Sequence, residues 1–120
     1  PMIKFEEKGI TFCRYQDLFE IQDKPLNTQK VMGKCDIGAA KTIVIGDSGG
    51  DGPHFEWGAT AGAFLIASMA KSSLDQYCSR RGIEINLYFG PRYSMGAKRS
   101  AASEMGVNFM DLRPEIEKIL

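Results

Sequence analysis

The sequence has no net charge, because 15 basic residues balance 15 acidic ones across 120 residues. This balance removes any global electrostatic argument for binding to nucleic acid or to an anionic membrane surface. No apolar run approaches the roughly 20 residues of a membrane-spanning helix, and no signal-peptide pattern opens the sequence. We therefore expect a soluble, cytoplasmic protein that binds neither nucleic acid nor membrane.

Histidine and cysteine are also scarce, with one histidine and three cysteines (Cys13, Cys35 and Cys78). The cysteines are odd in number and lack metal-type spacing, which favours reduced thiols over a disulfide framework and argues against a zinc site. The single histidine, His54, closely follows Ser48. A trypsin-like protease takes its base and orienting aspartate from far upstream, so the segment 46–50 is not the nucleophile segment of such an enzyme.

Repeats, low-complexity tracts and long linkers are absent, so the length predicts one domain over residues 1–120. Short alternating segments predict a hairpin over residues 3–13, and Pro25 breaks the chain before a short helix that begins at Asn27 or Thr28. The predicted strands then cover residues 42–45, 63–66, 83–89 and 107–110, and the predicted helices cover 54–59, 72–81, 94–104 and 114–120. Such alternation predicts an α/β fold, namely a three-layer, Rossmann-like domain with a mostly parallel sheet.

The segment 62–69 has two interpretations. It is either a second buried strand or part of one helix over residues 55–81. The helix would be apolar all round in its first half and would contain Gly58 and Gly62, so we favour the strand.

The most informative segment is Thr-Ile-Val-Ile-Gly-Asp-Ser-Gly-Gly-Asp-Gly at residues 42–52. The apolar β-branched run is typical of a buried parallel strand, and the glycines let the next turn approach a ligand. Asp47 and Asp51 would follow the carboxyl end of this strand, where open α/β sheets bind ligands, and two carboxylates suit Mg²⁺. The alternative is a solvated turn in which an aspartate caps the next helix.

This strand and its loop resemble the fourth motif, Gly-Asp-x-x-x-Asp, of the haloacid dehalogenase-like hydrolases. Asp23-Lys24-Pro25 resembles the third motif of that superfamily, with Lys30 as a second candidate for its lysine, and the resemblance covers roughly residues 23–69. It implies that Asp47 and Asp51 hold Mg²⁺ directly or through water. It also implies that Lys24 is a catalytic residue that binds phosphate together with Ser48 and Gly49, in phosphoryl transfer through an aspartyl-phosphate.

The nucleophile of that family lies in an Asp-x-Asp motif, and no Asp-x-Asp occurs in this sequence. The sequence resembles the carboxyl-terminal portion of such a hydrolase and lacks the residue that would perform the covalent step. The strands that would flank residues 42–45 are then missing, and an open sheet edge favours pairing. We therefore expect a homo-oligomer or a complementary chain, with Ile43, Ile45, Phe64 and Ile66 near the buried surface.

The function that this pattern favours is a haloacid dehalogenase-like phosphohydrolase domain, or its metal-binding portion, acting on a small phosphorylated metabolite. The main alternative is a non-catalytic α/β interaction or self-assembly module that retains the acidic loop. A nucleotide-binding regulatory domain is less favoured, because two aspartates repel phosphate unless a metal intervenes. Arg92, Lys98 and Arg99 form either an anion site at a helix start or a solvated basic face.

Overall fold

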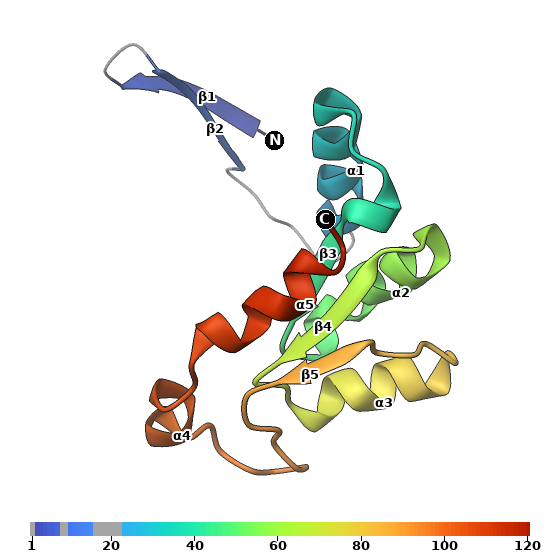
Figure 1. Cartoon of the computed structure of the whole chain (residues 1–120), viewed down its shortest axis with the longest axis vertical. Coiled ribbons are helices and arrows are strands. Elements are labelled where there is room, and N and C mark those ends of the chain that lie inside the picture. The colour runs from blue at the N-terminus through green and yellow to red at the C-terminus, as the bar shows by residue number, and fades with distance from the viewer. Residues whose placement is uncertain (1, 8–9, 16–22) are drawn as a thin grey trace.

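Strands and helices alternate along most of the chain in the computed structural model, which describes residues 2–7, 10–15 and 23–120 (Figure 1). The strands are β1 (Met2–Glu7), β2 (Ile10–Tyr15), β3 (Ile43–Gly46), β4 (Phe64–Ser68) and β5 (Leu87–Phe89). The helices are α1 (Asp23–Cys35), α2 (Gly52–Ala61), α3 (Ser72–Arg80), α4 (Ala101–Met105) and α5 (Arg113–Glu117). Short 3-10 turns are η1 (Ala39–Lys41), η2 (Gly49–Asp51) and η3 (Phe109–Leu112).

The central sheet contains three parallel strands in the order β3-β4-β5. Val44 lies beside Leu65 in its register, and Ile66 lies beside Leu87. The strands β1 and β2 form a separate antiparallel hairpin, as predicted. The chain is therefore an α/β protein with a small open parallel sheet, which confirms the predicted α/β class and the parallel strand direction.

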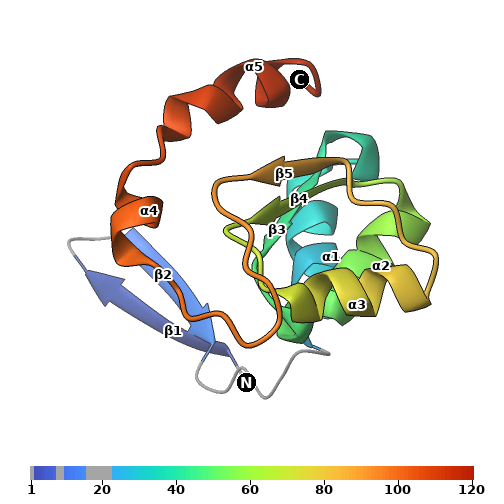
Figure 2. The ribbon, with the colours of Figure 1, turned by 90° about the horizontal axis from the view of Figure 1, so that it is seen from below.

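One face of the sheet is covered by α2 and α3, whereas α5 crosses the opposite face (Figure 2). The α2 and α3 side encloses a core of eight buried residues: Val44, Phe55, Ala63, Leu65, Ala67, Ala70, Leu74 and Cys78. Leu74 and Cys78 lie one helical turn apart on α3, as the sequence pattern predicts. Since the strands carry apolar residues on both faces, helices on both sides remove them from water.

The second core lies between the sheet and the C-terminal segment. Ile66, Phe89 and Leu112 form its centre, and Ile43, Phe64, Leu87, Val107 and Ile116 pack around them. Alternation along β3 places Ile45 on the same face as Ile43, yet Ile45 is 51% exposed. The cover on this face is therefore incomplete beside the outer edge of β3.

The segment 62–69 is a strand, β4, and not part of a long helix. Helix α2 ends at Gly62, whose positive φ of 90° is a conformation that glycine adopts without strain. Among the described side chains, Cys35 and Cys78 are free thiols, in line with the expectation of reduced cysteines. No helix in the described part of the chain is long and apolar enough to cross a bilayer.

The prediction that Pro25 breaks the chain before a helix is wrong, because α1 begins at Asp23 and contains Pro25 in its first turn. Proline is accepted there because the first N–H groups of a helix have no carbonyl partner within it. Helix α1 therefore begins earlier than expected, and this start places Lys24 at its first turn.

The predictions for residues 83–120 are also partly wrong. The strand predicted over 83–89 is limited to β5. Just before β5, Asn86 N donates to the Leu65 carbonyl at 3.0 Å, and Asn86 Oδ1 accepts from Leu65 N at 2.7 Å, so a side-chain oxygen takes the place of a strand carbonyl. The helix predicted over 94–104 is limited to α4, which begins after Ser100 caps it. The strand predicted over 107–110 is absent, and η3 begins instead where the Asn108 side chain accepts from Met110 N.

Candidate functional site

A depression of about 430 Å³ lies at the carboxyl edge of the sheet, beside the acidic loop. Nine residues line it: Ile45, Gly46, Asp47, Asp51, Ser68, Met69, Arg99, Glu104 and Phe109. Strands β3 and β4 both end at this depression. The carboxyl edge of the strands is where α/β sheets bind ligands. The structure thus brings Asp47 and Asp51 to one depression, together with Arg99 and Glu104, which the sequence did not place there.

Asp51 is buried, with 9% of its surface exposed, and it is bonded on both carboxylate oxygens. Lys24 Nζ donates to Asp51 Oδ1 at 2.5 Å across 27 residues of sequence. Asp51 Oδ2 accepts from the backbone N–H groups of Asp47 at 2.8 Å and of Ser48 at 3.4 Å. Burial raises the pKa of Asp51, but the Lys24 hydrogen bond, the backbone donors and the Lys24 charge outweigh burial and hold the pKa below its ordinary value. An ionised Asp51 therefore ties the loop to α1.

Only glycine fits at position 46, immediately before the loop. A Cβ added to Gly46 would lie 2.6 Å from the Cβ of Asp51 and 2.8 Å from its Oδ2. Because Gly46 at the end of β3 has no side chain, the Asp51 carboxylate can occupy this space. Asp51 completes a capping box with Ser48 on η2, but its side chain makes no cap hydrogen bond to the next helix, α2. The alternative interpretation, a solvated turn in which an aspartate caps that helix, is therefore wrong for Asp51, which is buried.

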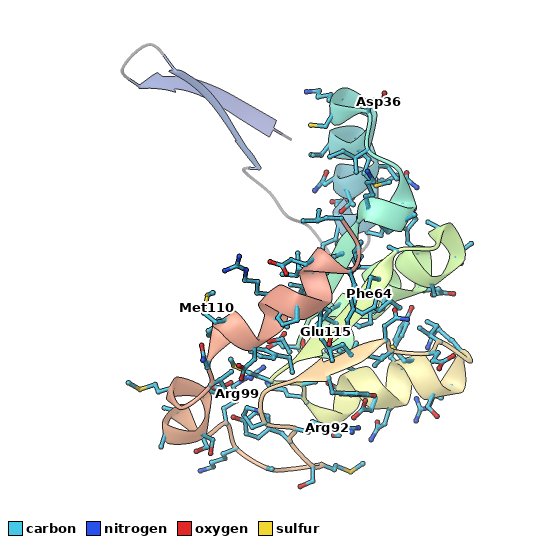
Figure 3. All side chains as sticks on the ribbon, in the orientation of Figure 1. Asp36, Phe64, Arg92, Arg99, Met110 and Glu115 are labelled. Carbon is cyan, nitrogen blue, oxygen red and sulfur yellow. The ribbon has the colours of Figure 1, made fainter. Side chains whose placement is uncertain are left out.

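Asp47 points outward from the same loop, and its side chain is 50% exposed. The Arg99 Nη2 donates to Asp47 Oδ2 across 52 residues of sequence, and Arg99 is labelled in Figure 3. The Arg99 Nη1 also donates to the Met69 carbonyl at 2.9 Å and to Glu104 Oε1 at 2.8 Å. Arg92 is not part of this cluster, because it pairs with Asp75 and lies over the Tyr88 ring.

The remaining predicted residues lie on or near the loop. The Gly49 N–H donates to Ser73 Oγ at 2.9 Å, so this donor and that of Ser48 already have partners within the chain. Lys24 reaches the loop, whereas Lys30 lies exposed farther along α1. A phosphate-binding role for Ser48 and Gly49 stays a prediction.

A chain of hydrogen bonds holds Lys24 in place from behind. Thr28 Oγ1 donates to the Lys24 carbonyl at 3.0 Å, and His54 Nε2 lies 2.9 Å from the same hydroxyl oxygen. Because the hydroxyl hydrogen is used, we assign the ring hydrogen to His54 Nε2, which then donates to Thr28. His54 on α2 therefore fastens the first turns of α1 beside the acidic loop, a role that no local sequence signal indicated.

The environment of His54 predicts a pH-dependent stability. Burial lowers the pKa of His54, the nearby Lys24 charge lowers it further, and Asp51 only partly opposes them, so the pKa lies below the ordinary 6.5. Between that lowered pKa and 6.5, the unfolded chain binds more protons than the folded chain does. The stability that the neutral His54 ring contributes is therefore fully present above about pH 6.5 and is lost as the pH falls. We expect urea unfolding to show a steeper loss of stability between about pH 8 and pH 5 for the wild type than for His54→Gln. Equal slopes for the two proteins would contradict this assignment.

The candidate donors for Mg²⁺ in the depression are carboxylates. No group of three histidine, cysteine or carboxylate side chains gathers to hold a metal ion within residues 23–120. Mg²⁺ takes one or two protein carboxylates and keeps several waters. Asp47 is half exposed but pairs with Arg99, and the oxygens of Asp51 already bind Lys24 and the backbone. An Mg²⁺ ion would have to displace at least one of these partners, so the magnesium site stays a prediction.

Comparison of the chain with protein-family models, with curated proteins and with solved structures finds no match. The resemblance to haloacid dehalogenase-like hydrolases therefore depends on the residues and geometry described above.

Proposed function

We propose that the chain is the metal-binding portion of a haloacid dehalogenase-like phosphohydrolase domain that acts on a small phosphorylated metabolite in the cytoplasm. The observation that carries this proposal is the pairing of Lys24 with Asp51 at the carboxyl edge of a parallel sheet. The sequence motifs that suggested the family lie far apart in the chain, and their two charged residues meet in space. Helices on both faces of the sheet are compatible with the three-layer, Rossmann-like form of that family.

In this proposal each residue of the loop has a separate task. Asp47 would hold Mg²⁺ directly, and Asp51 would act through a metal-bound water while it orients Lys24. The Lys24 ammonium would attract the phosphoryl oxygens. The N–H groups of Ser48 and Gly49 would bind the same oxygens only after giving up their present acceptors, Asp51 Oδ2 and Ser73 Oγ. The metal would supply neutralisation of the phosphate charge.

The nucleophile would come from another strand. No described strand pairs with the outer edge of β3, and Ile45 on this strand is half exposed. An unpaired parallel edge next to the acidic loop suits a strand that brings a carboxylate to the depression. We propose that a complementary chain pairs there and brings the nucleophile. A second copy of this chain could cover the same edge, but it lacks the Asp-x-Asp motif.

One observation favours the alternative, a non-catalytic interaction or self-assembly module. Arg99 already neutralises Asp47, and Phe109 and Met110 expose large apolar side chains close to the depression. A surface of this kind suits a protein partner without any metal.

A Mg²⁺ titration followed by the backbone amide NMR spectrum tests the proposal and separates the two functions. We expect millimolar Mg²⁺ to shift the amides of residues 46–52, because Asp47 offers one carboxylate and the remaining ligands are water. Asp47→Asn should abolish these shifts. Asp36→Asn is the matched control, since Asp36 lies at the far end of α1 (Figure 3) and its positive φ of 53° is well tolerated by asparagine.

Unchanged amides at residues 46–52, or identical shifts in Asp47→Asn, would contradict the metal-binding function. Such a result would favour the interaction module.

A further inference from the structure

The outer edge of β3 carries backbone groups that no described strand binds. In the central sheet β3 pairs with β4, and the described strands β1 and β2 pair with each other. Phe64 N donates to the Thr42 carbonyl at 2.9 Å, so the Thr42 carbonyl faces β4. Because the backbone groups of successive strand residues point to opposite edges, the N–H and C=O groups of Ile43 and Ile45 point away from β4. An open edge of this kind is a template for another strand.

Apolar side chains surround this edge and are incompletely covered by their own chain. Ile45 on β3 is 51% exposed. A second depression, of about 420 Å³, lies between α1 and β3. Val31 and Ile37, which are 55% and 41% exposed, line it together with Ile43. Apolar surface on both sides of an unpaired strand marks a protein interaction surface.

The charges at the two ends of β3 are opposite in sign and equally far from its middle. Lys41 lies three residues before Val44, and Asp47 lies three residues after it. Lys41 is exposed, and the Asp47 side chain is 50% exposed beside its bond to Arg99. A carboxylate accepts more than one donor, so Asp47 has room for a second cation. The segment 41–47 is therefore complementary in charge to a reversed copy of itself.

The backbone has the same self-complementarity. When two copies of β3 meet antiparallel with Val44 opposite Val44, Ile43 of each copy lies opposite Ile45 of the other. The outward N–H and C=O groups of these two residues then face one another as a hydrogen-bonded pair. Their side chains lie on one face of the sheet, so the exposed Ile45 gains an apolar neighbour.

We propose that two copies of this chain pair through the outer edges of β3, antiparallel and centred on Val44, so that their two three-stranded sheets form one continuous sheet. A two-fold axis at Val44 relates the copies, which is the commonest symmetry of soluble dimers. The inference goes beyond the proposed function and needs neither a metal nor a phosphate. The second copy and the proposed complementary chain occupy the same edge, so they exclude one another.

Sedimentation equilibrium of the full chain at roughly 1–100 µM measures the self-association. We expect a monomer–dimer equilibrium. Ile45→Lys should weaken it more than about 10-fold, because the dimer would bury an ammonium without a partner. Lys41→Glu should weaken it about 10-fold, since it places like charges at both ends of the paired strands. Arg80→Glu is the matched control and should change nothing, because it reverses an exposed charge on α3, away from β3.

A mixture of two charge variants tests the register. Lys41→Glu and Asp47→Lys each place like charges at both ends of the paired strands, so each alone should associate about 10-fold more weakly than the wild type. An equimolar mixture restores opposite charges at both ends and should form a heterodimer with the wild-type affinity. Circular dichroism verifies that each variant folds.

Three results would overturn the inference. A wild type that stays monomeric over the whole concentration range excludes the dimer, and a dimer that Ile45→Lys leaves intact excludes pairing through β3. A mixture that associates no better than its two components excludes the register centred on Val44. These measurements contain no Mg²⁺, so their failure leaves the proposed function standing, and a failed Mg²⁺ titration leaves the dimer standing.

Discussion

Replacing Asp51 with alanine is expected to lower the free energy of unfolding by about 2–4 kcal/mol. The variant leaves the Lys24 ammonium without its carboxylate and the N–H groups of Asp47 and Ser48 without their acceptor. Water reaches the partly exposed Lys24, so the loss is expected to be smaller than for a fully buried ion pair. Urea unfolding monitored by circular dichroism measures the change.

Asp47→Asn is the matched control for this experiment. It removes a carboxylate from the same loop, but the ion pair with Arg99 is half exposed and should contribute less than about 1 kcal/mol. If Asp51→Ala destabilises the protein no more than Asp47→Asn does, the buried contacts of Asp51 do not hold the loop to α1.

Replacing Phe55 with alanine is expected to cost about 3–5 kcal/mol of stability. Phe55 is 0% exposed and lies in the core that α2 and α3 form with the sheet, so its removal leaves a cavity beneath β3 and β4. Thermal or urea unfolding measures the effect.

Phe109→Ala removes the same side chain from a position that is 60% exposed and should cost less than about 1 kcal/mol. If Phe55→Ala costs as little as is expected for Phe109→Ala, the buried position of Phe55 does not contribute to stability as proposed.

Much of the fold from β3 to α3 could be predicted from the sequence because local signals there agree with the tertiary structure. The run at residues 42–45 breaks into glycines, Pro53 occupies the first turn of α2, and Leu74 with Cys78 gives α3 a buried face. The acidic loop could also be placed from the sequence. It directly follows the predicted strand at residues 42–45, and in a parallel sheet the loop after a strand lies at the carboxyl edge.

The C-terminal region behaves differently. Residues 94–110 contain polar and small side chains without a clear period, and the predicted long helix and short strand are wrong there. Contacts with distant elements set their conformation, such as the bonds of Arg99 to Asp47 and Met69. A local pattern has no information about such partners, because their free energy arises only after the sheet has formed.

The sequence by itself determined the α/β class, the direction of the sheet and the two aspartates at its edge, because apolar periodicity and glycine placement act over a few residues. The tertiary structure decided which charges meet. It selected Lys24 rather than Lys30 for the loop, gave His54 a partner in Thr28, and brought Arg99 across 52 residues onto Asp47. These pairings depend on how helices and loops pack on the sheet. Packing brings together residues that are far apart in the sequence, and no local sequence pattern indicates which of them will meet.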